Sequence, residues 1–140
     1  MVKIAVTIWC ILISTTLASH CPFGWVNFGE SCYYVYDYPL YSYEEAEIVC
    51  TGMGSTLVNV NDADENLFLK AFTLNQYHIW IGLQSEFIWA DRSLLTYSNW
   101  MSGDTSQKIK CVHLYSNQHG KWRDIACSNR FGFICEREAF

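Results

Sequence analysis

Cysteine is the residue type in this chain with the clearest chemical purpose. The chain holds seven cysteines among 140 residues. Cys10 lies in an apolar stretch near the N-terminus, and the other six follow it: Cys21, Cys32, Cys50, Cys111, Cys127 and Cys135. Six cysteines in a short exported chain imply three disulfides, and spacing alone leaves 15 pairings open. None of the six forms a C-x-x-C pair, so neither a zinc ribbon nor a thioredoxin-type site is favoured.

Histidine is the second residue type that could do chemistry. His113 and His119 lie six residues apart with Asp124 nearby, a set that could begin a zinc site. Zinc takes three or four converging ligands, and no third strong ligand is evident, so we expect the histidines on the surface or in loops. The sequence shows no nucleophile elbow, phosphate-binding loop or paired-carboxylate motif. With the cysteines expected in disulfides, we do not expect an enzyme.

Charge is distributed unevenly along the chain. Residues 19–100 hold ten acidic and two basic residues, a net charge of −8, whereas residues 101–140 hold four acidic and six basic residues, a net charge of +2. The whole chain is mildly acidic, so we do not expect it to bind nucleic acid.

The N-terminal stretch has the pattern of a secretory signal. Lys3 gives a positive start, and Ile4–Ile13 is an apolar run too short to cross a bilayer. Small residues before and at Ala18 suit a signal peptidase, and the short run argues against an uncleaved anchor. We therefore expect a signal peptide over residues 1–18 and one secreted domain over residues 19–140, without a membrane span.

Two helices are predicted in the first half of the chain. Ser42 begins the first helix, and Glu45 completes a capping box. Asp62 begins the second helix, with Glu65 at the corresponding position. The expected buried faces are, for the first helix, Ala46, Val49, Cys50 and Met53, and for the second, Phe68, Ala71 and Phe72.

Short strands account for the other predicted elements. An aromatic hairpin over Trp25–Phe28 and Cys32–Tyr36 precedes the helices. The remaining predicted strands are Leu57–Val60, Ile79–Leu83, Phe87–Ala90, Cys111–Tyr115, Lys121–Asp124 and Phe131–Glu136. Helices early and short strands late indicate an α+β fold.

Several motifs in the second half resemble those of one protein family. They are Trp80-Ile81-Gly82-Leu83, Phe87–Asp91 with Trp89, Tyr97-Ser98-Asn99-Trp100, Gly120-Lys121-Trp122 and Gly132–Glu136. Together with the six cysteines, they resemble the C-type lectin-like family from Cys21 to about Glu138. The resemblance implies two helices packed on short antiparallel sheets, a long loop region, and packing roles for the tryptophans. It also implies one set of disulfides: Cys21–Cys32, Cys50–Cys135 and Cys111–Cys127.

The resemblance also indicates where sugar-binding members hold calcium. They use oxygens from a loop triplet, a later Glu and a Trp-Asn-Asp strand. Here the triplet reads Asp104-Thr105-Ser106, His113 replaces an acid, and Arg123 stands in the place of Asn. Only Asp104 and Asp124 remain as candidate metal ligands, whereas calcium takes six to eight oxygens. We therefore expect no cofactor, calcium included.

The resemblance predicts a secreted recognition module that binds an extracellular glycan or a protein. The alternatives are a calcium-dependent lectin with a divergent site and a surface-adsorbing protein of the antifreeze or matrix type. The candidate ligand-binding residues are Asp104, Ser106, Lys108, Lys110, His113, Tyr115, Lys121, Arg123 and Asp124. Cations dominate this set, with Arg130 expected nearby, which favours an anionic ligand gripped by Arg123. The competing interpretation is a charged loop that serves solubility alone.

Overall fold

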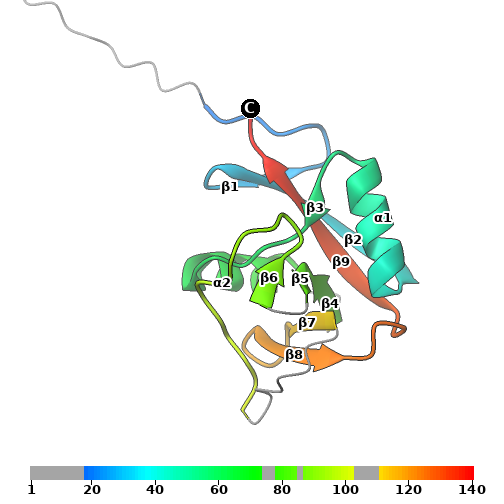
Figure 1. Cartoon of the computed structure of the whole chain (residues 1–140). Coiled ribbons are helices and arrows are strands. Elements are labelled where there is room, and N and C mark those ends of the chain that lie inside the picture. The colour runs from blue at the N-terminus through cyan, green and yellow to red at the C-terminus, as the bar shows by residue number, and fades with distance from the viewer. Residues whose placement is uncertain (1–17, 74–77, 85–86, 103–110) are drawn as a thin grey trace, which may run out of the picture.

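A sheet of seven strands, counted over the described residues, crosses the domain (Figure 1). The computed structural model describes residues 18–73, 78–84, 87–102 and 111–140. The sheet has the order β1-β2-β9-β4-β7-β8, and β3 pairs with β9 outside this path. Its strands are β1 (Val26–Phe28), β2 (Ser31–Tyr41), β3 (Thr56–Leu57), β4 (His78–Ile81), β7 (Cys111–Tyr115), β8 (Lys121–Ile125) and β9 (Phe131–Glu138). A separate small sheet consists of β5 (Leu83–Gln84) and β6 (Ile88–Trp89).

The β1–β2 hairpin and β9 bring the two ends of the described chain together. β1 pairs with β2 and β2 pairs with β9, both antiparallel. The backbone N–H of His20 donates to the carbonyl of Phe140 at 2.7 Å, and that of Phe140 donates back at 3.0 Å. The predicted hairpin is confirmed. β2 runs further than expected because, after a register shift, Tyr41 pairs again with Phe131 of β9.

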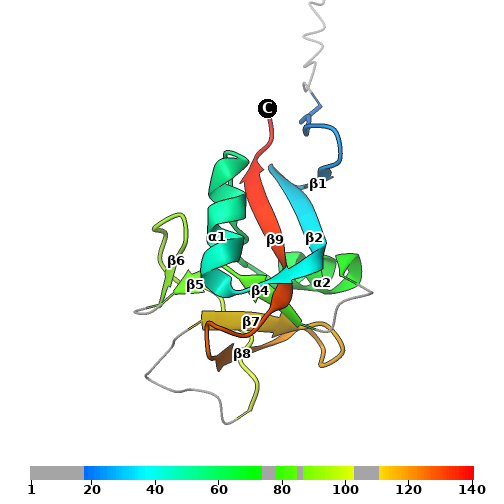
Figure 2. The ribbon, with the colours of Figure 1, turned by 90° about the vertical axis from the view of Figure 1, so that its right-hand side faces the viewer.

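The first predicted helix is confirmed as α1 (Tyr43–Gly52). The Ser42 backbone N–H donates to a Glu45 carboxylate oxygen at 2.8 Å, and the Glu45 N–H donates to the Ser42 hydroxyl at 3.3 Å. Ala46 and Cys50 are fully buried, as the spacing predicts. Figure 2 shows α1 alongside β9, to which Cys50 is bonded.

The second predicted helix is confirmed as α2 (Ala63–Phe72), but its expected buried face is wrong. The most deeply buried side chains on this helix are Glu65, Asn66 and Leu69. Phe68 and Phe72 are only partly buried, and Ala71 is exposed. Glu65 and Asn66 face inward because each accepts a buried hydrogen bond from a distant strand. The Tyr33 hydroxyl donates to Glu65 at 2.7 Å, and the Trp122 indole N–H donates to Asn66 at 2.8 Å. Helical periodicity cannot reveal such pairings.

The segment Leu57–Val60 is buried throughout, although only Leu57 within it belongs to a strand. The Val58 N–H donates to the carbonyl of Ile134 at 2.9 Å, and the Gly82 N–H donates to the carbonyl of Val58 at 2.8 Å. A Cβ at Gly82 would lie 2.6 Å from the carbonyl oxygen of Leu57. The close approach of these backbones therefore requires the glycine.

The later strands match the sequence closely. β6, β7, β8 and β9 lie within two residues of their predicted bounds. The predicted strand Ile79–Leu83 is divided at Gly82 into β4 and β5. The three disulfides implied by the family resemblance are all present: Cys21–Cys32, Cys50–Cys135 and Cys111–Cys127.

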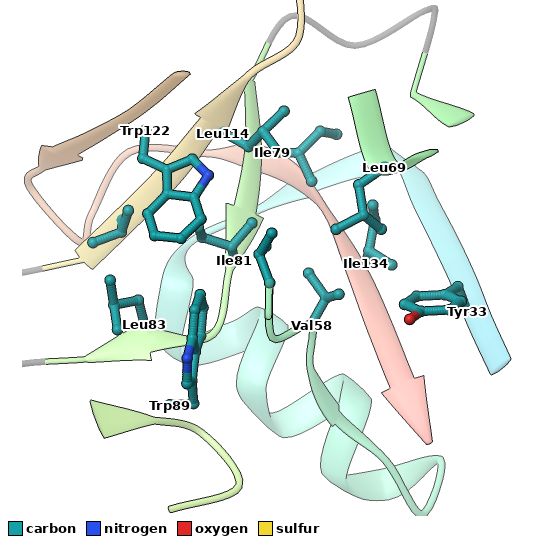
Figure 3. Close-up of a cluster of buried hydrophobic side chains, with 12 residues drawn as sticks. Tyr33, Val58, Leu69, Ile79, Ile81, Leu83, Trp89, Leu114, Trp122 and Ile134 are labelled. Carbon is teal, nitrogen blue, oxygen red and sulfur yellow. The ribbon is translucent and has the colours of Figure 1, made fainter. Parts of the chain in front are cut away.

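Large aromatic side chains fill the core, as expected. Trp80, Trp89 and Trp122 are fully buried, and Trp100 is partly buried. The rings of Trp89 and Trp122 meet edge to face with centroids 5.6 Å apart (Figure 3). In Figures 1 and 2 the β7–β8 hairpin lies at the opposite end of the domain from the C-terminus.

Candidate ligand face on strands β7 and β8

The β7–β8 hairpin brings together four of the predicted ligand-binding residues. In its antiparallel register, His113 lies opposite Arg123 and Tyr115 lies opposite Lys121. Because side chains alternate along a strand, these four residues share one face of the hairpin, which we call the Arg123 face. Asp124 lies opposite Val112 and therefore belongs to the other face.

Trp122 fixes the orientation of β8. Its indole N–H donates to the side-chain oxygen of Asn66 at 2.8 Å, and its ring meets those of Trp89, Tyr97 and Trp100 edge to face. Its backbone N–H donates to the carbonyl of Asn99 at 2.8 Å. Since Trp122 points into the core, its neighbours on β8 must point to the other side of the strand.

The cationic groups of the Arg123 face are held in different ways. The Lys121 ammonium donates to the side-chain oxygen of Asn99 at 2.8 Å, and the Asn99 amide donates to the carbonyl of Gly120 at 2.9 Å. Arg123 is exposed, while Tyr115 is partly buried. The backbone positions of Lys121 and Arg123 are about 7 Å apart, as for any residues two positions apart on a strand. The face can therefore present two positive charges beside an aromatic ring.

His113 is buried, so the expectation of a surface or loop histidine is wrong for this residue. It is 1% exposed, and its Nδ1 lies 3.4 Å from Nδ1 of His78. The His78 ring stacks on Phe131, with centroids 4.8 Å apart. Burial lowers the pKa of His113 to about 4, with smaller effects from the charges of His78 and Arg123. His113 is therefore a neutral residue of the sheet at physiological pH, whereas His119 is exposed as expected.

The other candidate residues lie elsewhere. Arg130 pairs with Glu45 at 3.0 Å, beside the start of α1. Four candidates, Asp104, Ser106, Lys108 and Lys110, fall outside the described residues. Within the described ranges, no group of three or more His, Cys, Asp or Glu side chains is arranged to hold a metal ion.

The structure contains a second polar site that the sequence analysis missed. A pocket of about 650 Å³ lies beside β9, lined in part by Asn59, Asp91, Ser93 and Glu136. Asn59 donates from its side chain to Asp91 at 2.6 Å and from its backbone to Glu136 at 2.9 Å. Burial raises the pKa of Glu136 to about 7. These residues come from separate segments, and the only signals in the sequence were that Asp91 and Glu136 end two of the family-like motifs.

Comparison with known proteins identifies the class that this fold and face define. A family model described as Lectin C-type domain matches residues 40–137, and the chain belongs to this family. It is 35% identical over 130 residues to the human low affinity immunoglobulin epsilon Fc receptor, covering 85% of this chain and 39% of the receptor. It is 30% identical over 131 residues to a C-type lectin mannose-binding isoform of Notechis scutatus scutatus, covering 83% of this chain and 82% of the lectin.

Solved structures agree with this assignment. The carbohydrate-recognition domain of cow CD23, determined in the presence of a GlcNAc2Man3 oligosaccharide, is 33% identical with a TM-score of 0.78, covering 87% of this chain and 98% of that one. Human lithostathine is 27% identical with a TM-score of 0.76, covering 85% and 91% of the two chains. These relatives are receptors and lectin-like recognition proteins rather than enzymes. The chain spans about two fifths of the length of the immunoglobulin epsilon Fc receptors that it matches.

Proposed function

We propose that this protein is a secreted recognition module that binds an extracellular glycan or protein through the Arg123 face, without the calcium site of sugar-binding family members. One observation carries the proposal. Arg123 is exposed on β8, directly opposite buried His113, at the strand position where calcium-binding members supply an oxygen ligand.

The charges of β8 support a ligand that is not held through calcium. Among the described residues of the β7–β8 hairpin, Asp124 is the one carboxylate, and it lies on the face opposite Arg123. Calcium needs six to eight oxygens, and a neighbouring guanidinium opposes a divalent cation. The described residues at β8 therefore do not fit a calcium ion.

The same charges favour an anionic ligand. The guanidinium of Arg123 can donate two parallel hydrogen bonds to a sulfate or a carboxylate. The ammonium of Lys121, held by Asn99, adds a second positive charge on the same face. Tyr115, opposite Lys121 and partly buried, offers a ring against which a sugar could pack. A sulfated or sialylated glycan and an acidic protein surface both carry the anionic groups that this face would bind.

Three disulfides and the N-terminal pattern support secretion. Disulfides persist in oxidising compartments, and this chain forms three of them within one domain. The signal peptide over residues 1–18 and the domain limits 19–140 remain predictions. In the ranges that the structure describes, no helix has the length and apolar character needed to cross a membrane.

Neither alternative function gains support from the comparisons. The calcium-independent type II antifreeze protein has a TM-score of 0.79 but is 23% identical, so it shows the fold alone. The oligosaccharide beside the cow CD23 domain belongs to that structure and does not identify the ligand of this chain.

A glycan array, probed with and without EDTA, tests the proposal. We expect binding to sulfated or sialylated glycans that is unchanged when EDTA removes calcium. Arg92→Ala is the matched control for Arg123→Ala, because it removes the same charge from an exposed residue after β6. Binding that EDTA abolishes would contradict the proposal and restore the calcium-dependent alternative.

A further inference from the structure

Two histidines form a pair on the same side of the sheet as Arg123, and one of them, His113, belongs to the Arg123 face. His78 on β4 and His113 on β7 come from neighbouring strands, and their Nδ1 atoms are 3.4 Å apart. Phe131 covers both rings, with centroid distances of 4.8 Å to His78 and 5.1 Å to His113. Tyr115 packs edge-on against His78 with its centroid 4.3 Å away. Protonation of both rings in this arrangement is unfavourable, because two imidazolium rings at this distance repel each other.

The charged groups that act on His113 oppose added positive charge, and a backbone hydrogen bond with Leu114 offsets only part of their effect and that of burial. The charged groups that act on His113 are His78 and Arg123, and both oppose its protonation. The elements around the pair also carry Tyr115 on β7, Lys121 on β8, Tyr36 and Tyr41 on β2, and the mutually paired Glu45 and Arg130. The carboxylate of Asp124 on β8 lies on the other face of the hairpin, because Asp124 is opposite Val112. Phe131, the covering residue from β9, carries no charge. Protonation of both histidines is therefore disfavoured while the strands are closed and becomes more favourable when they separate.

We infer that the His78–His113 pair is an acid-responsive element that opens the β7–β8 hairpin and thereby disrupts the Arg123 face. Arg123 lies opposite His113 in the ladder, and Lys121 lies opposite Tyr115, the residue that packs against His78. Separation of β7 from β4 or β8 thus displaces His113 and Tyr115, the residues opposite Arg123 and Lys121. The consequence for ligand binding rests on the proposed function, whereas the opening itself does not.

The size of the effect follows from proton linkage. The pKa of His113 is about 4 in the closed hairpin, whereas an imidazole in water has a pKa of about 6.5. Opening therefore becomes about thirtyfold more favourable at about pH 5 than at about pH 7.4. Glu136, towards the other end of β9, has a pKa raised to about 7, so acid stabilises that part of the fold. Acid is thus expected to loosen β7–β8 selectively rather than unfold the domain.

Hydrogen exchange of the disulfide-bonded protein tests this inference without a ligand. Exchange rates are measured at about pH 5 and about pH 7.4. Each rate is divided by the intrinsic rate of the same amide at the same pH, which gives the opening equilibrium of that amide. The opening equilibrium at Val112 and Leu114 should rise about thirtyfold in acid, whereas that at Tyr34 and Ile134, in the β2–β9 pair, should not rise. An equal rise in both strand pairs, or no rise in either, would overturn the inference.

Histidine variants assign the effect to the pair. His113→Phe should reduce the acid-induced rise to within about twofold, and His78→Phe serves if the first variant does not fold. His119→Gln is the matched control, because His119 is exposed and should leave the thirtyfold rise intact. Loss of the rise in the control variant, or its persistence in His113→Phe, would contradict the assignment. Retention on heparin at the two pH values is a separate measurement, and a failure to bind heparin at either pH would count against the proposed function alone.

Discussion

His113 and Arg123 lie opposite each other in the β7–β8 ladder, the imidazole buried and the guanidinium exposed. One pair of cross-strand neighbours therefore joins the aromatic core to the candidate ligand face. The same ladder places Trp122 on the core side of β8, so a change in the core can reach the face through a single strand. The predictions below follow from this arrangement and from the buried polar groups around it.

The hydrogen bond between Trp122 and Asn66 should be a large contributor to stability. Asn66→Ala leaves the buried indole N–H of Trp122 without its acceptor. An unsatisfied buried donor costs about 1–3 kcal/mol, so we expect the free energy of unfolding in urea to fall by that amount. Asn27→Ala is the control, because its side-chain hydrogen bonds are exposed, and it should change stability by less than about 0.5 kcal/mol. Equal losses of unfolding free energy in the two variants would contradict a large contribution from the hydrogen bond between Trp122 and Asn66.

Calcium should not stabilise this protein. A ligand that binds the folded state raises the melting temperature, and the described residues at β8 do not fit a calcium ion. We expect the same melting temperature in EDTA and in millimolar calcium, measured by differential scanning fluorimetry. A rise of several degrees with calcium would show that the protein holds the ion.

Glu136 should make stability depend on pH in a direction unusual for a carboxylate. Its pKa is raised to about 7 by burial, above the usual value for Glu of about 4.3. Its contribution to stability is therefore full below about pH 4 and is lost as the pH rises through about 7, by about 4 kcal/mol. Glu136→Gln should match the parent in unfolding free energy at about pH 5 and exceed it at about pH 8. A variant less stable than the parent at both pH values would contradict this origin of the pH dependence.

The disulfides should differ in their effect on stability because they close loops of different length. Cys50–Cys135 spans 85 residues, and Cys21–Cys32 spans 11. Loop-closure entropy predicts losses of about 5 kcal/mol and about 3 kcal/mol when each pair is replaced by alanine. Denaturant unfolding of the two double variants measures the difference. A larger loss for the short loop would contradict the entropic explanation.

Sequence predicted the fold well where the signal was local or carried by the family motifs. The capping box at Ser42, the hairpin before it and the strand at Cys111–Tyr115 all depend on neighbouring residues. The pairing of the cysteines came from the resemblance alone, and the structure confirms it.

Sequence failed where a polar residue is buried by a distant partner. Asn66 faces the core because Trp122 donates to it, although the helical pattern favoured Phe68 and Ala71 as the buried face. His113 is buried because His78 and Phe131 cover it, and those residues come from other strands. Such partners become neighbours only when the sheet is assembled, so no local pattern could place them.

Retention on immobilised heparin in the presence of EDTA tests the central claim most directly. The parent and Arg123→Ala are compared at low and moderate salt, with Arg92→Ala as the control for loss of charge elsewhere. We predict that the parent and Arg92→Ala are retained at low salt and elute as salt screens the interaction, whereas Arg123→Ala loses about 1.5–3 kcal/mol of binding free energy. Equal retention of the parent and Arg123→Ala, or no retention of the parent, would contradict recognition of an anionic ligand through Arg123.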